Sequence, residues 1–325
     1  MQNEENQIDL KDDTYQVDDS VADHYDASAE SYHLQYERNL ISDLSREYPA
    51  NYFRLHQLIN SFLENNIKHV VEIGVGEGTP LVTLAKAGMD VYGCDISRNM
   101  VEKTKLNFRK NNLDESRIIW ADVQDPITYS PLLEGGRFEG LLAMGVMPHV
   151  RNEKFVLNNM KNIVKPGGKV FIEFRNKLFS MFTFNRYTYE FIMDDLLKNV
   201  SSKLKNHVSK DLLKRLEMDK PTPRLKGESG NLSDGFENEE CIGYDAILSK
   251  FHNPFEIEKL FRDNKFTNIK LLWYHYHPAM PYLESEDNAL FRDEGLKLEH
   301  EDSNWRGLFL CSAFVVEANT PNFED

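Results

Sequence analysis

The stretch that decides the fold is residues 69–78, which read HVVEIGVGEG. Its first half is a short apolar run, typical of a buried strand. Gly74, Gly76 and Gly78 follow at alternate positions, where they let the backbone turn sharply and approach a ligand. The pattern is not G-x-G-x-x-G, because position 79 is Thr, and no Gly-Lys pair of a P-loop follows. The stretch therefore predicts a strand, a tight turn and a helix whose first N–H groups face a ligand.

Strands and helices alternate on both sides of this turn. Further apolar runs predict strands at 90–97, 117–123, 138–146, 169–174, 267–277 and 308–318. Helical spacing predicts helices at 21–40, 49–66, 81–89, 99–113, 153–165 and 253–266. Such alternation indicates βαβ units, a mostly parallel sheet and helices on both of its faces.

The alternation is interrupted, and the interruptions set the predicted domain organisation. Residues 1–20 are predicted to be a disordered acidic tail, and 319–325 a second tail. Residues 21–175 and 251–318 form the predicted α/β domain. Residues 176–250 hold many aromatic side chains, then a basic helical stretch and a polar stretch with glycines and prolines. We expect them to form an inserted helical cap that includes a mobile loop.

Composition narrows the class of protein. The chain has 325 residues, 41% of them apolar and 28% charged, which is globular composition. Its net charge is −15, and residues 1–30 contribute ten acids and one lysine to it. An acidic chain disfavours non-specific nucleic-acid binding. No apolar run approaches the roughly 20 residues of a membrane helix, and no signal peptide begins the chain. Three scattered cysteines fit a reducing compartment, so we expect a cytoplasmic protein that uses neither a membrane nor nucleic acid.

Two acids stand where the predicted strands end. Asp95 ends the second strand, seventeen residues after Gly78, where a carboxylate can accept two ribose hydroxyls. Asp122 ends the third strand, where a carboxylate can accept an adenine amine. Open α/β sheets bind ligands at the carboxyl ends of their strands, which is where both acids are placed.

With these residues in order, the chain resembles the class I S-adenosylmethionine-dependent methyltransferases. The matching pieces are E-I-G-V-G-E-G, Y-G-C-D-I-S, A-D-V-Q-D, G-V-M-P-H-V and K-P-G-G-K-V-F-I-E-F, and they span about 20–175 and 253–318. Within the family the chain is most similar to small-molecule enzymes, including the sugar and ubiquinone types. It lacks the N-P-P-Y or D-P-P-Y motif of enzymes that methylate DNA bases.

The resemblance implies a Rossmann-like seven-stranded sheet whose last strand is antiparallel, with S-adenosylmethionine as cofactor. It implies that Asp95 grips the ribose and that the backbone of the glycine turn meets the methionine part. A helix from Tyr25 to Tyr36 resembles the family's lid, although simple core packing of these tyrosines stays open. The implied cofactor residues are Tyr25, Tyr36, Glu72, Gly74, Gly76, Gly78, Asp95, Ile96, Met100, Asp122, Val123, Met144 and Gly145.

The catalytic candidates are histidines and one acid. Transfer to a hydroxyl needs a base, whereas an amine need only arrive unprotonated. His149 follows the fourth strand, and Glu173 in the fifth is expected to orient it. Related sugar O-methyltransferases place a His and an acid at these two positions, usually Asp instead of Glu. His275 and His277 point to one face of a strand and are a second candidate pair; no third metal ligand is evident, so no metal is expected.

The inserted segment and the residues that flank it supply the predicted acceptor contacts. Arg175 and Arg186 are expected to hold an anionic group, and Tyr187 and His252 to line the same region. We therefore predict O-methylation of a sugar, nucleotide-linked sugar or secondary metabolite. N-methylation of an amino sugar or small amine, and a catalytically silent scaffold that keeps the cofactor fold, remain the alternatives. The sequence leaves open whether the protein forms a homodimer.

Overall fold

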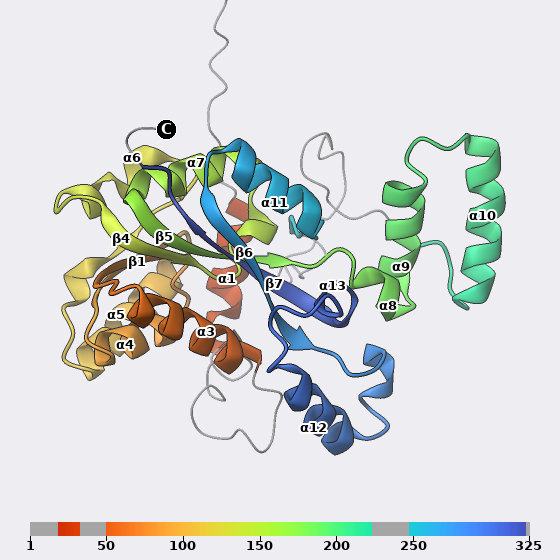
Figure 1. The fold of residues 1–325 in the computed structure, drawn as a ribbon, viewed down its shortest axis with the longest axis horizontal. Helices are drawn as coiled ribbons and strands as arrows, with labels where there is room; N and C mark the ends of the chain where they lie inside the picture. The colour runs from red at the N-terminus through yellow and green to blue at the C-terminus, as the bar shows by residue number, and fades with distance from the viewer. Residues whose placement is uncertain (1–18, 33–49, 223–246, 323–325) are drawn as a thin grey trace, which may run out of the picture.

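The computed structural model describes residues 19–32, 50–222 and 247–322. A seven-stranded sheet runs through the centre of the molecule, in the order β3-β2-β1-β4-β5-β7-β6 (Figure 1). Its strands are β1 His69–Ile73, β2 Asp90–Asp95, β3 Ile118–Trp120, β4 Phe138–Ala143, β5 Val164–Arg175, β6 Thr267–Tyr276 and β7 Cys311–Asn319. The first five strands run parallel, and β7 is antiparallel to both of its neighbours. The predicted fold class is confirmed, including the antiparallel last strand.

Helices cover both faces of the sheet (Figure 1). One face carries α3 Ala50–Glu64, α4 Thr79–Lys86 and α5 Arg98–Lys110; the other carries α6 Pro126–Tyr129, α7 Glu153–Ile163 and α11 Pro254–Asp263. Single 3-10 turns lie at Glu115–Arg117, Ser130–Leu133, Met147–His149 and Pro281–Leu283. The sheet and its helices enclose two hydrophobic cores, one on each face.

Strand geometry explains why there are two cores. Successive side chains of a strand point to opposite faces. In β4, Leu141 joins the core under α7 and α11, while Leu142 joins the core under α3 and α4, and both are fully buried. Because both faces are covered, the parallel strands read as continuous apolar runs, and this is why they were recognisable in the sequence.

The segment inserted after β5 projects sideways from the sheet (Figure 1). It contains α8 Ser180–Thr183, α9 Arg186–Glu190, a π-helical stretch Phe191–Leu196 and α10 Ser202–Arg215. None of the α10 residues is buried. The predicted helical insertion is therefore present, while most of the polar stretch at 219–240 lies outside the described residues.

The second insertion, between β6 and β7, forms α12 Asn288–Leu298 and the short α13 Gly307–Leu310. The prediction that the last strand begins at residue 308 is wrong, because residues 307–310 make one more helical turn. There the Gly307 backbone packs against the Trp273 ring, where a Cβ would meet the ring at 2.2 Å. The strand proper begins at Cys311.

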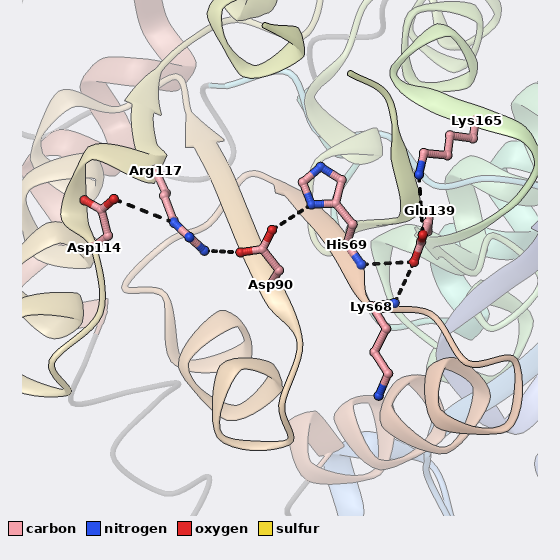
Figure 2. A network of polar contacts seen from close by, with 7 residues as sticks. All are labelled: Lys68, His69, Asp90, Asp114, Arg117, Glu139 and Lys165. Atoms are coloured by element: carbon pink, nitrogen blue, oxygen red, sulfur yellow. Dashed lines mark hydrogen bonds and ion pairs between the residues drawn. The ribbon is translucent and has the colours of Figure 1, made fainter. Parts of the chain in front are cut away.

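A polar network closes the amino-terminal end of the sheet (Figure 2). His69 Nδ1 lies 2.9 Å from Asp90, and Arg117 pairs with the same carboxylate. Glu139 accepts hydrogen bonds from the backbone N–H groups of Lys68 and His69, at 2.8 and 3.2 Å. These contacts join the amino-terminal ends of β1, β2 and β4, so charged groups stabilise this end of the sheet. The ligand site lies at the opposite, carboxyl end. Within the described ranges, no helix is long and apolar enough to cross a membrane.

Candidate active site

A pocket lies at the carboxyl ends of β1, β2, β3 and β4. It is lined by Val21, Tyr25, Ile73, Gly74, Gly76, Asp95, Ile96, Met100, Ala121, Asp122, Val123, Gln124, Met144, Gly145, Val146, His149 and Val150. Ten of the thirteen residues predicted for the cofactor are among them. The sequence missed mainly apolar lining, such as Val21 and Val146, because an apolar side chain at a strand end gives no sign of whether it meets a ligand or the core.

The glycine turn shapes the floor of the pocket. Gly74 and Gly76 both have positive φ, 76° and 54°, a conformation that costs other residues free energy. A Cβ on Gly74 would lie 2.5 Å from Cγ2 of Val146. Gly78 was predicted to approach the cofactor, but it does not line the pocket; a Cβ there would strike Thr104 of α5, 2.5 Å away. It serves the packing of α4 against α5. Glu72, also predicted here, is buried in β1 and does not line the pocket either.

Asp95 fixes the shape of the turn. Its carboxylate accepts hydrogen bonds from the backbone N–H of Gly76 and of Ser97, both at 2.9 Å. The pKa of Asp95 is raised to about 6, and burial of the carboxyl group is the largest cause of this shift. A buried carboxylate facing the pocket is a strong acceptor for ribose hydroxyls, provided that it is ionised.

Asp122 offers an unused acceptor. The residue is 2% exposed, and its Oδ1 accepts the N–H of Gln124 at 2.8 Å. Its Oδ2 is buried and has no hydrogen-bond partner among the described residues. Burial raises the pKa of this carboxyl too. A buried unsatisfied oxygen is costly, and an amine donor such as that of adenine would satisfy it.

Helix α1, Asp19–Tyr32, covers the pocket with Val21 and Tyr25. The Asp26 carboxylate accepts the N–H of Asn99 at 3.1 Å and the hydroxyl of Ser97, so α1 is fastened to the first turn of α5. The sequence analysis did not predict a role for Asp26, although this residue directly follows Tyr25 in the predicted lid helix. The predicted Tyr36 lies outside the described residues.

His149 meets the pocket with a defined ring orientation. Its Nδ1 lies 2.8 Å from the carbonyl oxygen of Leu248. Because a carbonyl only accepts, Nδ1 carries the proton of the neutral ring, and Nε2 is the basic nitrogen. Nε2 accepts a hydrogen bond from the hydroxyl of Tyr25 at 3.0 Å. The basic nitrogen therefore faces the pocket beneath α1.

The expectation that Glu173 orients His149 is wrong. Glu173 pairs with Arg54 of α3, and the carbonyl of Leu248 holds the imidazole instead. The reason is the alternation of side chains along β5. Glu173 lies two residues after Phe171, which packs in the core beneath α3, so its carboxylate points to that face of the sheet.

His275 and His277 lie side by side, with ring centroids 4.8 Å apart, but neither lines the cofactor pocket. His275 Nδ1 contacts the hydroxyl of Ser312 at 2.8 Å. The ring of His277 packs on Phe179 and Phe291, and its nitrogens are buried. Burial lowers their pKa values to about 4 and about 3. Across the part of the chain that the structure describes, no group of three His, Cys, Asp or Glu could hold a metal ion.

The residues predicted to contact the acceptor gather around a second cavity. Tyr187 and His252 line it, and Arg186 pairs there with the lining residue Glu190, at 3.0 Å. Arg175 donates to Ser249, another lining residue, at 2.9 Å. The structure thus separates the predicted cofactor residues from the predicted acceptor residues.

The chain is similar to known methyltransferases. Residues 71–172 match the family model described as "Methyltransferase domain". The ubiquinone biosynthesis O-methyltransferase of Coxiella burnetii is 27% identical over 173 residues, which cover 48% of this chain and 69% of the relative. That of Bartonella tribocorum is 26% identical over 157 residues, 46% of this chain and 61% of the relative. Among solved structures, magnesium protoporphyrin IX methyltransferase from Synechocystis PCC 6803 with bound SAH has a TM-score of 0.48 at 13% identity, covering 92% of this chain and 97% of that one.

The sheet order, the glycine turn and the acids at the ends of β2 and β3 define a Rossmann-like protein built for a nucleoside cofactor. The matched domain coincides with β1 to β5 and contains that turn and both acids. The chain therefore contains an S-adenosylmethionine-dependent methyltransferase domain with the class I fold. Its cofactor is S-adenosylmethionine, and the pocket supplies groups of the right kind for it: an acid for the ribose, an unused acceptor for the adenine amine and a bare backbone for the methionine part.

Proposed function

We propose that the enzyme transfers the methyl group of S-adenosylmethionine to a hydroxyl of a small molecule, with His149 as the base. The observation that carries the proposal is the orientation of His149, whose basic Nε2 faces the cofactor pocket while Nδ1 is held by a carbonyl. The curated relatives are O-methyltransferases of ubiquinone biosynthesis, which supports oxygen as the accepting atom.

The residues around His149 account for the proton. When bound, the cofactor supplies a methyl group already activated on a sulfonium, so the protein has to position the acceptor and take its proton. The hydroxyl of Tyr25 marks a hydrogen-bonding position 3.0 Å from Nε2, and an acceptor hydroxyl takes this place. The proton passes to Nε2, and the carbonyl of Leu248 stabilises the resulting imidazolium through Nδ1–H.

His149→Ala tests this role. Loss of a positioned base should lower kcat by about 10²–10⁴, while the affinity for S-adenosylhomocysteine in calorimetry stays close to that of the wild type. The lower limb of the pH–rate profile should disappear, because only the neutral imidazole accepts a proton. His56→Ala, which removes an exposed histidine of α3, is the control.

Two results would contradict the assignment. If His149→Ala retained activity within a few-fold on an acceptor that the wild type methylates, His149 would not be the base. If the pH limb persisted and moved with the pKa of an amine acceptor, the enzyme would be an N-methyltransferase. Normal S-adenosylhomocysteine binding in the variant shows that the fold survives, so either result is interpretable.

We also propose a cytoplasmic setting. Cys94 and Cys311 are both buried free thiols, which fits a reducing compartment. The third cysteine, Cys241, lies outside the described residues.

A further inference from the structure

A cavity of about 590 Å³ lies beside the cofactor pocket, and the two share no lining residue. Its walls are the first turns of α7 and α11, residues 249–253, and the inserted helices from Tyr187 to Lys198. The volume is that of a small-molecule site. Apart from Asn152, Glu153 and Lys154, its lining residues lie beyond the matched methyltransferase domain, in the insertion and at residues 249–260.

The cavity and the cofactor pocket are separated by a thin wall. His149 and Val150 line the pocket, whereas Asn152 and Glu153 line the cavity. Two residues of extended chain span at most about 7 Å. The wall itself is a crossing of two segments, in which the N–H of Lys250 donates to the carbonyl of Pro148 at 2.9 Å. The cavity therefore lies next to the segment that carries His149.

The charges around the cavity nearly balance. Four lysines and five carboxylates line it: Lys154, Lys177, Lys198, Lys250, Glu153, Glu190, Asp194, Asp195 and Glu256. Opposite charges are interleaved, as in the pairs of Lys177 with Asp195 at 2.9 Å and Lys250 with Glu153 at 2.8 Å. With Arg186, which pairs with Glu190, the charges around the cavity balance, so no excess charge favours an anionic ligand. Covering so many charged groups with a hydrocarbon tail would cost their hydration. Such a surface suits a neutral ligand rich in hydrogen-bonding groups.

Two further features point to a ring that carries hydroxyl groups. The rings of Tyr187 and Phe251, 5.2 Å apart, give the cavity an aromatic wall on which the C–H face of a saturated ring can pack. His252 is 6% exposed, and its Nδ1 makes no hydrogen bond with any residue that the structure describes. Its Nε2 lies 3.4 Å from Glu153. Burial lowers the pKa of His252, so the ring is neutral and offers a donor and an acceptor, as a hydroxyl does.

We propose that this cavity binds the body of the methyl acceptor, and that the acceptor is a neutral polyhydroxylated ring compound such as a sugar or a glycoside. The inference rests on the proposed O-methyltransferase function and adds the class of its substrate. It also distinguishes this enzyme from its curated relatives, whose names refer to ubiquinone biosynthesis.

Saturation-transfer NMR tests the cavity without a known acceptor. The probes are a panel of common hexoses, deoxyhexoses and their methyl glycosides, with hexylcatechol as a lipophilic comparison, and S-adenosylhomocysteine is present throughout. The wild type should transfer saturation to sugar ring protons, with Tyr187→Ala weakening the affinity about tenfold. Tyr282→Ala, which removes a tyrosine 57% exposed and outside the cavity, should bind the sugar as the wild type does.

The overturning results are specific. If no sugar of the panel binds the wild type, or if Tyr187→Ala and Tyr282→Ala bind it equally, the proposal is wrong. If hexylcatechol binds in a Tyr187-dependent manner and the sugars do not, the cavity takes a lipophilic acceptor. His252→Gln is a second variant in case Tyr187→Ala does not fold, and it should also weaken sugar binding. Sugar binding in the cavity does not require His149, and the His149→Ala test compares activities on any acceptor that the wild type methylates, so failure of the proposed function would be seen separately.

Discussion

At the scale of single residues, Asp95 joins the backbone turn to the ligand site. Its carboxylate holds Gly76 and Ser97 and faces the pocket, and burial brings its pKa to about 6. The sequence placed this acid correctly because a residue at the carboxyl end of β2 must stand beside the glycine turn that ends β1. Those two strands pair in register, Ile73 against Cys94.

Asp95→Ala should weaken S-adenosylhomocysteine binding by roughly 1.5–3 kcal/mol, the value of a lost hydrogen bond to a charged group. Wild-type affinity should also fall as the pH decreases through about 6, because the protonated carboxyl is a poorer acceptor for ribose hydroxyls. Calorimetry across this range measures both effects. Glu134→Gln, an exposed acid outside the pocket, is the control. Equal affinities of wild type and Asp95→Ala would remove Asp95 from the cofactor site.

At the scale of secondary-structure elements, α1 acts through its attachment to α5. The Asp26 carboxylate caps the first turn of α5 together with Ser97, whose hydroxyl accepts the N–H of Met100 at 3.1 Å. An acid at a helix N-terminus is stabilised by the helix dipole and by unpaired N–H groups. The same contact keeps Val21 and Tyr25 over the pocket, so the position of the covering helix depends on one carboxylate.

Asp26→Asn should loosen α1 and speed cofactor release. The charge-assisted part of the contact is worth about 1–2 kcal/mol, or roughly a tenfold change in off-rate. Stopped-flow dissociation of S-adenosylhomocysteine gives the off-rate; it is best recorded well above pH 6, where Asp95 is ionised in both proteins. Asp23→Asn changes an exposed acid of the same helix and should have no effect. A variant at position 26 that releases cofactor at the wild-type rate would show that α1 does not retain it.

At the scale of the whole molecule, the buried histidines link stability to pH. His275 lies in β6 and contacts Ser312 of β7, and the charges of Glu173 and Arg54 act on it. His277 follows β6 and packs on Phe179 and on Phe291 of α12. Burial lowers their pKa values from 6.5 to about 4 and about 3. Between pH 6.5 and 4 the unfolded chain binds protons that the folded protein excludes. Stability is therefore lost as the pH falls, by up to about 1.4 kcal/mol per pH unit for each histidine.

His277→Phe should remove part of this loss, because Phe packs against Phe179 and Phe291 and does not titrate. The free energy of unfolding, measured in urea at several pH values, should fall less steeply below pH 6.5 in the variant than in the wild type. His56→Gln, at an exposed position of α3, should leave the steepness unchanged. Parallel curves for His277→Phe and the wild type would show that this ring is not a source of the acid sensitivity.

The fold followed from local pattern over most of the chain. Apolar runs such as residues 69–73 and 138–143 became buried parallel strands because both faces of the sheet are covered. The predicted start of the last strand was wrong, because residues 307–310 form a helical turn whose Gly307 packs against the Trp273 ring, a partner distant in the sequence. Local pattern cannot register a partner of that kind.

By itself the sequence determined the sheet, the glycine turn and the acids Asp95 and Asp122 of the cofactor pocket, because residues at the carboxyl ends of parallel strands meet wherever their strands pair. Only the tertiary structure decided what surrounds His149. Its partner is Leu248, 99 residues away, while Glu173 faces Arg54, 119 residues away on the other side of the sheet. The position of a residue in a strand fixes the face of the sheet to which its side chain points. Which group lies opposite that side chain depends on how distant elements pack, and the local sequence pattern does not contain this information.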